Sequence, residues 1–248
     1  MSLLVIGSFE TTSALRATLI AAGLDGGAIA GATAAIGKRF SIAREALRAG
    51  QHAVVTGVLA DCRQAGELFA LAAERQRCFL LGLPVAPGSP LQALANRSQA
   101  RVDLATIRGG WSGDEDELID GITRELVACL RALPDGPEAP QVAAHRSDPA
   151  RPCGAVWVTL SFPSGPSIQL ELDRARKLRR ETIQIRGDAG LVRHESAAAC
   201  ADFAPVAARF LRSRGRALAA SEVQAELARL AVVDEVRSAL ESARAAGW

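Results

Sequence analysis

The feature that most constrains the fold is the stretch from Ala43 to Gln76, in which helical and strand patterns alternate closely. His52-Ala53-Val54-Val55 is a short and nearly continuous apolar run, which is typical of a strand buried on both faces. The residues before it have the apolar spacing of a helix, and a second helix is expected to open at Ala60-Asp61. Buried strands separated by helices indicate a parallel sheet covered on both faces.

The residues around this stretch repeat the same alternation. Leu3–Gly7 predicts a strand, followed by a Thr-Thr-Ser cluster that caps a helix and by Gly23, which ends it. Further strands are expected within residues 28–36 and 78–84, and further helices over about 41–49 and 61–76. The first part of the chain therefore predicts successive βα units.

The pattern changes after Pro84. Apolar and polar residues alternate in 156–162 and 168–172 on either side of a Pro-Ser-Gly-Pro turn, which predicts a β-hairpin with one apolar face. The other elements expected in this half are strands over 101–108, 182–186 and 190–194, a helix over 114–133 and a linker-like loop over 134–152. The tail from Ser221 to Ala246 predicts an amphipathic helix.

Composition excludes several classes of protein. The net charge of +2 argues against a dedicated nucleic-acid binder. No apolar run reaches the ~18 residues of a transmembrane helix, and the N-terminus has no signal-peptide pattern. The five cysteines form no C-x-x-C pair and the three histidines lie far apart, so no metal site is expected. We therefore expect a cytoplasmic protein that binds neither membrane nor nucleic acid.

The 43–76 stretch resembles the signature region of the Gfo/Idh/MocA family of NAD(P)-dependent oxidoreductases, A-L-x-A-G-x-H-V-x-x-E-K-P-L-A. The matching residues are Ala46-Leu47, Ala49-Gly50, His52 and Leu59-Ala60, with His52 expected in a structural role. Thr56-Gly57-Val58 replaces the E-K-P, so Gly57 stands where the family places a lysine that contacts cofactor and substrate. The hairpin followed by Gly187–Val192 resembles a second region of the family.

The resemblance, together with these patterns, predicts an α/β chain in three parts. Residues 1–88 form a Rossmann-like parallel-sheet domain, truncated because the segment before the signature stretch is too short for one strand and one helix of the family. Residues 89–215 form an α+β domain with an open antiparallel sheet. Residues 216–248 form a C-terminal helix that packs back on the N-terminal domain.

The cofactor turn of this fold is altered in the sequence. A Rossmann fingerprint needs three glycines, and here the positions hold Gly7, Phe9 and Thr12. Phe9 puts a bulky side chain where the pyrophosphate would approach, and Glu10 adds a negative charge that repels a phosphate.

Two basic residues keep a second interpretation of this turn open. Lys38 and Arg39 follow the second expected strand and could meet the 2′-phosphate of NADP, or they could be a solvated pair at the start of a helix. With Gly7 they are the candidate cofactor-binding residues. We expect no cofactor, with NAD(P) as the alternative.

The catalytic positions are also altered. Residues 118–123 resemble the family's L-x-D-x-G-x-H-x-x-D helix, but Thr123 replaces the histidine and Asp120 lies one position out of register. Threonine has no basic form near neutral pH and cannot act as a general base. If the chain is active, Asp120 and His194 are the candidate catalytic residues.

The leading hypothesis is a catalytically degenerate Gfo/Idh/MocA-like protein that is not an enzyme and acts as a non-catalytic subunit or interaction partner, including of an intact family enzyme. Family members dimerise through the open face of the second sheet, so we expect a homodimer or a heteromer with a related oxidoreductase. The candidate interface residues are Trp157, Thr159, Gln169 and Glu171. The alternatives are a divergent but active NAD(P)-dependent oxidoreductase acting on a small molecule, and a nucleotide or metabolite sensor.

Overall fold

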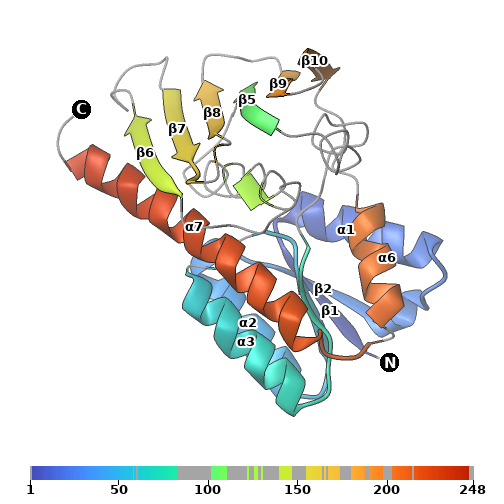
Figure 1. Cartoon of the computed structure of the whole chain (residues 1–248). Helices are drawn as coiled ribbons and strands as arrows, with labels where there is room; N and C mark the ends of the chain where they lie inside the picture. Colours follow the sequence, from blue (N-terminus) through green and yellow to red (C-terminus); the bar gives the residue numbers. More distant parts are fainter. Residues whose placement is uncertain are drawn as a thin grey trace. The chain divides into compact units, whose positions relative to one another are not determined.

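The computed structural model of the chain is drawn in Figure 1. The structure describes residues 2–57, 59, 61–82, 102–110, 122, 126–127, 130, 140–146, 155–163, 165, 167–173, 180–187, 190–197, 203–213 and 215–245. The chain divides into two compact units. The first contains Met1–Val85 and Ala201–Leu227, and the second contains Ala86–Cys200 and Ala228–Trp248.

The first unit is built on a parallel sheet with the strand order β2-β1-β3-β4. Its elements are β1 (Leu3–Gly7), α1 (Phe9–Ala21), the 3-10 turn η1 (Gly26–Ala28), β2 (Ile29–Thr33), α2 (Ile36–Arg48), β3 (His52–Val55), α3 (Cys62–Glu74), β4 (Phe79–Leu81) and α6 (Ala204–Ser213). Helices α1 and α6 cover one face of the sheet, and α2 and α3 cover the other (Figure 1). The predicted Rossmann-like parallel sheet is confirmed.

The sheet of this unit is shorter than a complete Rossmann sheet, whose strand order is 3-2-1-4-5-6. Helix α2 leads from β2 to β3, which pairs with β1, so no described strand pairs with the outer edge of β2. All residues from β2 to β3 are described. One strand and one helix of the first nucleotide-binding half are therefore absent at this point of the chain.

Two helices of this unit begin earlier than predicted. Ser8 is the N-cap of α1, and its Oγ accepts a hydrogen bond of 3.3 Å from the Thr11 backbone N–H. The Thr-Thr-Ser cluster thus lies inside the helix and does not cap it, because the Ser8 hydroxyl already accepts a hydrogen bond from a backbone N–H group of the first turn. Helix α2 begins at Ile36, which places Lys38 and Arg39 in its first turn.

Helix α6 was not predicted, and its residues were expected in the 89–215 domain. Phe203, Val206, Ala207 and Phe210 have helical spacing and lie in one buried cluster with Leu3 and other residues of the parallel sheet. This apolar stripe explains why α6 belongs to the first unit. The following helix α7 (Ala220–Ala245) is close to the predicted 221–246, and its residues up to Leu227 also belong to the first unit.

The second unit contains a six-stranded sheet with the order β10-β9-β5-β8-β7-β6. Its strands are β5 (Val102–Gly110), β6 (Gln141–Arg146), β7 (Ala155–Ser161), β8 (Ser167–Asp173), β9 (Arg180–Gly187) and β10 (Gly190–Ala197). All neighbouring strands run antiparallel except β5 and β8, so the sheet is mixed. The predicted hairpin corresponds to β7 and β8.

One prediction in this unit is wrong. The segment 134–152 was expected to be a loop, but it contains β6, which pairs antiparallel with β7. Strand β6 lies at the sheet edge, and its exposed and half-buried residues do not show the apolar alternation of a strand with one buried face. The predicted helix over 114–133 lies outside the described residues except for Ile122, Leu126, Val127 and Leu130, which are helical and buried.

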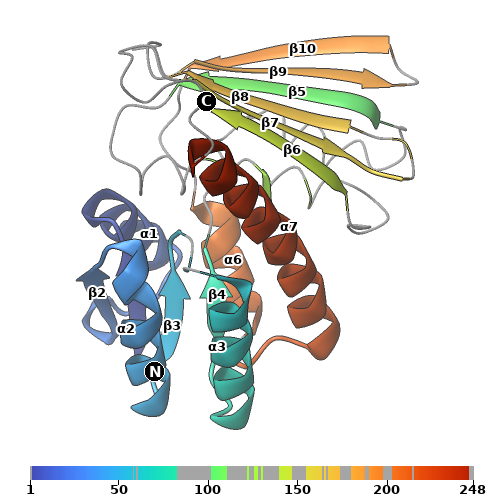
Figure 2. The same cartoon turned by 90° about the vertical axis from the view of Figure 1, so that its left-hand side faces the viewer.

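The two faces of the six-stranded sheet differ. Side chains such as Val158, Leu170 and Ile107 are buried on one face. On the other face, Trp157 of β7 remains 41% exposed. Within the second unit, no described helix or strand lies over this second face (Figure 2), which we call the open face.

Candidate functional site

The turn that follows β1 is held by packing around Gly7. A Cβ atom on Gly7 would overlap Thr56 Oγ1 and would lie 2.9 Å from Thr11 Oγ1. Thr56 follows β3 and is only 3% exposed. The space above Gly7 is therefore occupied by a side chain of the protein itself.

Three hydroxyl groups join the end of β1, the start of α1 and the end of β3. Thr11 Oγ1 lies 2.8 Å from Thr56 Oγ1, and Ser8 Oγ lies 2.9 Å from Thr11 Oγ1. Thr56 Oγ1 donates to the Ile6 carbonyl at 3.2 Å, and the Thr56 backbone N–H donates to the same carbonyl at 2.7 Å. We call Ser8, Thr11 and Thr56 the hydroxyl cluster. It satisfies polar groups at the strand ends where a parallel α/β sheet ordinarily binds its ligand.

Thr12 stands at the third position of the fingerprint, where a glycine normally allows close packing of helix and strand, and a glycine on another strand takes over this role. Thr12 is 6% exposed, and a Cβ atom on Gly31 of β2 would lie 2.9 Å from Thr12 Cγ2. The close approach of helix and strand that a glycine at position 12 would give is thus provided by Gly31 on the facing strand. Thr12 Oγ1 is buried without a hydrogen-bond partner among the described residues. The sequence signal was a lone glycine inside a weakly apolar strand.

The two basic candidates differ in position. Arg39 is 2% exposed, and its Nε donates to the Ala34 carbonyl at 3.2 Å, so it fixes the connection between β2 and α2. Lys38 is exposed. The two residues that directly follow β2, Ala34 and Ala35, include no carboxylate that could bind a ribose.

The catalytic candidates are not brought together by the described structure. Asp120 and Thr123 lie outside the described residues. His194 lies in β10, where its backbone is paired with Ile183 of β9. Gly57 is buried just after β3.

The four interface candidates do lie together on the open face. Trp157 is the cross-strand neighbour of Glu171, and Thr159 is the neighbour of Gln169. Arg108 on β5 lies beside Glu171, and its Nε is 2.8 Å from the carboxylate. The candidates therefore form two adjacent rows across β7 and β8.

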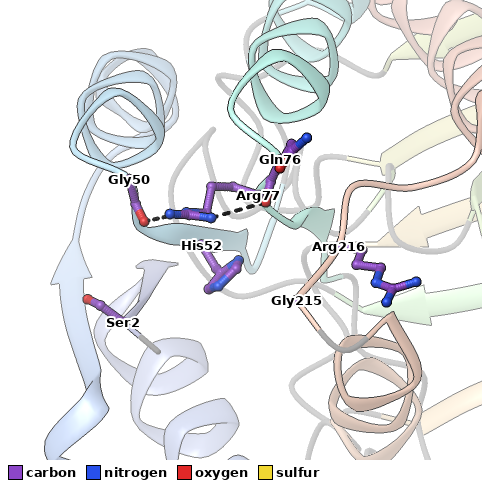
Figure 3. Close-up of a pocket in the computed structure, with 7 residues that line it drawn as sticks. All are labelled: Ser2, Gly50, His52, Gln76, Arg77, Gly215 and Arg216. Atoms are coloured by element: carbon purple, nitrogen blue, oxygen red, sulfur yellow. Dashed lines mark hydrogen bonds between the residues drawn. The ribbon is translucent and has the colours of Figure 1, made fainter.

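A cavity of about 510 Å³ lies at the opposite end of the parallel sheet (Figure 3). It is lined by Ser2, Gly50, His52, Gln76, Arg77, Gly215 and Arg216. Ser2 and His52 lie at the beginnings of β1 and β3, whereas Gly7 and Thr56 lie at their ends. We call this the amino-edge cavity.

His52 on this cavity has the structural role that the sequence predicted. Its Nδ1 accepts a hydrogen bond of 3.0 Å from the Cys78 backbone N–H and so joins β3 to the residue before β4. Burial, and then the positive charge of Arg77, lower the pKa of His52 below its ordinary value. The imidazole is therefore neutral at pH 7, with its proton on Nε2.

No metal centre or membrane-spanning helix is present in the described part of the chain. No three His, Cys, Asp or Glu side chains gather there in a group that could hold a metal ion. No helix within those residues is long and apolar enough to cross a bilayer.

Comparison with known proteins gives a match by structure and not by sequence. No protein-family model and no curated protein sequence matches the chain. GenD2 from gentamicin A biosynthesis, solved in complex with NAD, superposes with a TM-score of 0.70 over 100% of this chain and 95% of its own, at 16% identity. Biliverdin reductase from Synechocystis sp. PCC 6803, solved with biliverdin and NADP+, gives a TM-score of 0.69 over 97% and 99%, at 12% identity.

A third solved structure completes the comparison. The WlbA dehydrogenase from Bordetella pertussis, in complex with NADH and UDP-GlcNAcA, gives a TM-score of 0.69 over 99% of this chain and 97% of its own, at 15% identity. The chain has the Gfo/Idh/MocA dehydrogenase fold. The fold that the sequence resemblance implied is thereby confirmed, and it is a fold of NAD(P)-dependent oxidoreductases.

Proposed function

We propose that this chain is a non-catalytic homologue of the NAD(P)-dependent oxidoreductases whose fold it has. It acts by pairing, through the open face of its six-stranded sheet, with a second copy of itself or with a related oxidoreductase subunit. The observation that carries this proposal is the occupied space above Gly7.

A dinucleotide needs backbone close to its pyrophosphate and free N–H groups at the start of the first helix. Here the hydroxyl cluster fills the space above Gly7, and Ser8 takes the Thr11 N–H. Phe9 in the first turn of α1 is 72% exposed and adds a large apolar side chain at the approach. These contacts oppose phosphate binding at this turn.

The binding surface for the rest of the dinucleotide is also reduced. The strand and helix missing beside β2 would form the next part of the sheet. Arg39 is already bonded to Ala34, which leaves Lys38 as the one exposed cation of the candidate pair. A single lysine offers one point charge and no bidentate geometry for a 2′-phosphate.

The chemical groups that the family places against substrate are lost as well. Gly57 supplies no side chain at the lysine position, and a general acid cannot be replaced by a glycine. Binding and chemistry are thus weakened together, which supports loss of turnover.

The open face supports a role in assembly. Trp157 is 41% exposed beside polar side chains, and an aromatic anchor inside a polar surface is typical of a protein interface. The paired Arg108 and Glu171 would contribute orientation at such an interface.

The loss of cofactor binding is tested by calorimetric titration of the full chain with NADH and with NADPH. We expect no saturable binding at physiological cofactor concentrations. A dissociation constant in the low micromolar range would overturn the proposal, and Lys38→Ala would then be measured to locate the phosphate.

Assembly is tested by light scattering on the unmodified chain and on Trp157→Glu. We expect a dimer that becomes a monomer in the variant, because a buried charge at an anchor position costs ~2 kcal/mol or more. Leu211→Glu is the matched control, since Leu211 is exposed to a similar degree (39%) but lies on α6 of the first unit. A dimer that survives Trp157→Glu would refute the open face as the interface.

The second candidate function is an active oxidoreductase. It is favoured by the cofactors present in the compared structures, NAD with GenD2, NADP+ with biliverdin reductase and NADH with WlbA. Hydride transfer to any substrate by the purified chain, measured by nicotinamide absorbance, would establish it in place of the first.

A further inference from the structure

The amino-edge cavity is a second candidate site, separate from the turn at Gly7. Parallel α/β sheets bind their nucleotides at the carboxyl ends of the strands. The cavity lies at the amino ends, where the connections before β1, β3 and β4 and the turn after α6 meet. A ligand there would not compete for the nucleotide position.

The lining of the cavity is positively charged. Arg77 and Arg216 line it, and no Asp or Glu does. Among the described residues, no carboxylate forms a salt bridge with either arginine, although other arginines such as Arg209 do form them. Two unneutralised guanidinium groups on one cavity attract anions.

Arg77 is held in a fixed orientation. Its Nε donates to the Gly50 carbonyl at 2.6 Å, and its Nη1 donates to the Gln76 carbonyl at 3.2 Å (Figure 3). Its Nη2 makes no hydrogen bond to the described residues. The two N–H groups of Nη2 are therefore available, and the entropy of ordering the side chain is already lost.

His52 supplies a further donor. The residue is 7% exposed, and its Nδ1 accepts the hydrogen bond from the Cys78 N–H, which leaves the proton on Nε2. No described group accepts a hydrogen bond from Nε2. His52 lines the cavity, and its Nε2 is not one of the buried side-chain atoms without a partner among the described residues, so this donor is open to a water or ligand acceptor.

The C-terminal ends of three helices lie near the cavity, and their partial negative charges disfavour an anion there. Whether an anion can bind depends on how these charges compare with the positive charges of the two arginines. Gly50, Gln76 and Gly215 follow the C-termini of α2, α3 and α6. Each of these three helix ends carries a partial charge of about −0.5. Arg77 already bonds two carbonyls at these ends. Because two arginines carry full positive charges, the balance at the cavity stays positive.

We propose that the amino-edge cavity binds a small phosphate-bearing metabolite, held by Arg77, Arg216 and the Nε2–H of His52. Phosphate oxygens accept several charge-assisted hydrogen bonds at once and fit the planar donors of a guanidinium. Arg216 lines the other side of the cavity, is exposed and has no protein partner among the described residues. Its side chain points away from His52 and Arg77 in Figure 3, so it reaches the bound phosphate by a change of rotamer. The volume is in the range of small-molecule sites.

The test uses inorganic phosphate as the probe and the ¹H–¹⁵N spectrum of the full chain as the readout, at constant ionic strength with chloride. We expect saturable shifts at millimolar phosphate for the amides of Gly50, Gln76 and Gly215. Arg216→Gln should weaken binding about fivefold, the loss of one exposed charge-assisted contact. Arg212→Gln on α6 is the control with the same change of charge, and it should bind as the unmodified chain does.

Two results would overturn the proposal. The first is the absence of saturable shifts at these three amides, and the second is equal phosphate affinity in Arg216→Gln and Arg212→Gln. Neither result bears on nicotinamide binding or on the dimer, because the residues tested do not belong to the Gly7 turn or the open face.

Discussion

Gly7→Ala is the most direct test of how the first unit is built. The new Cβ would overlap Thr56 Oγ1 and crowd Thr11 Oγ1 at 2.9 Å, so Thr56 must move. Moving it breaks the bond to Thr11 at 2.8 Å and the bond to the Ile6 carbonyl at 3.2 Å. Gly7 is not among the residues with positive φ, so the cost comes from packing and not from backbone strain.

The expected loss follows from these contacts. Overpacking costs ~1–3 kcal/mol, and each lost hydrogen bond costs about 1 kcal/mol. We expect Gly7→Ala to lower the free energy of unfolding by roughly 3 kcal/mol. In a Thr56→Ala background the overlapping oxygen is gone, and the same change should cost at least ~1 kcal/mol less.

The assay must report on the first unit. All three tryptophans, at positions 111, 157 and 248, belong to the second unit, so their fluorescence does not report on Gly7. Native-state hydrogen exchange of the β1 and β3 amides measures the unfolding of the first unit directly.

A matched glycine provides the control. Gly37→Ala in α2 meets no atom within 4 Å and should raise stability by ~0.5–1 kcal/mol. If Gly7→Ala costs the same in both Thr56 backgrounds, the claim that Thr56 fills the space above Gly7 is wrong.

Two further predictions concern buried polar groups. Because the pKa of His52 is lowered in the folded chain, the unfolded chain binds more protons below pH ~6.5, and stability should fall as pH drops from 7 to 5. His52→Asn keeps an acceptor for the Cys78 N–H but does not titrate, so urea melts across this range should show a smaller pH slope. Arg209→Leu removes the guanidinium that lies 2.8 Å from the Glu226 carboxylate, which is 5% exposed, and should cost roughly 3 kcal/mol. The double variant Arg209→Leu/Glu226→Leu should recover most of this loss in the same melts, and no recovery would show that the ion pair is not the cause.

The sequence by itself determined the local elements. Apolar runs such as Leu3–Gly7 and His52–Val55 fixed the buried strands, because a strand buried on both faces needs apolar side chains throughout. The alternation in 156–172 fixed the hairpin of β7 and β8 by the period of two along a strand. The replacement of the family's lysine by Gly57 was also visible in the sequence.

The tertiary structure decided what depends on residues far apart in the chain. Gly7 meets Thr56 only because β1 and β3 are neighbours in the sheet, and Gly31 can replace a helix glycine only because α1 packs on β2. Arg39 is a buried structural residue, although sequence patterns for a basic pair predict an exposed ligand or a solvated face. The amino-edge cavity is lined by separate connections that carry no common motif. The spacing of apolar residues along a segment indicates which of its side chains are buried. It does not indicate which distant segment they meet, and that is decided by the topology of the fold.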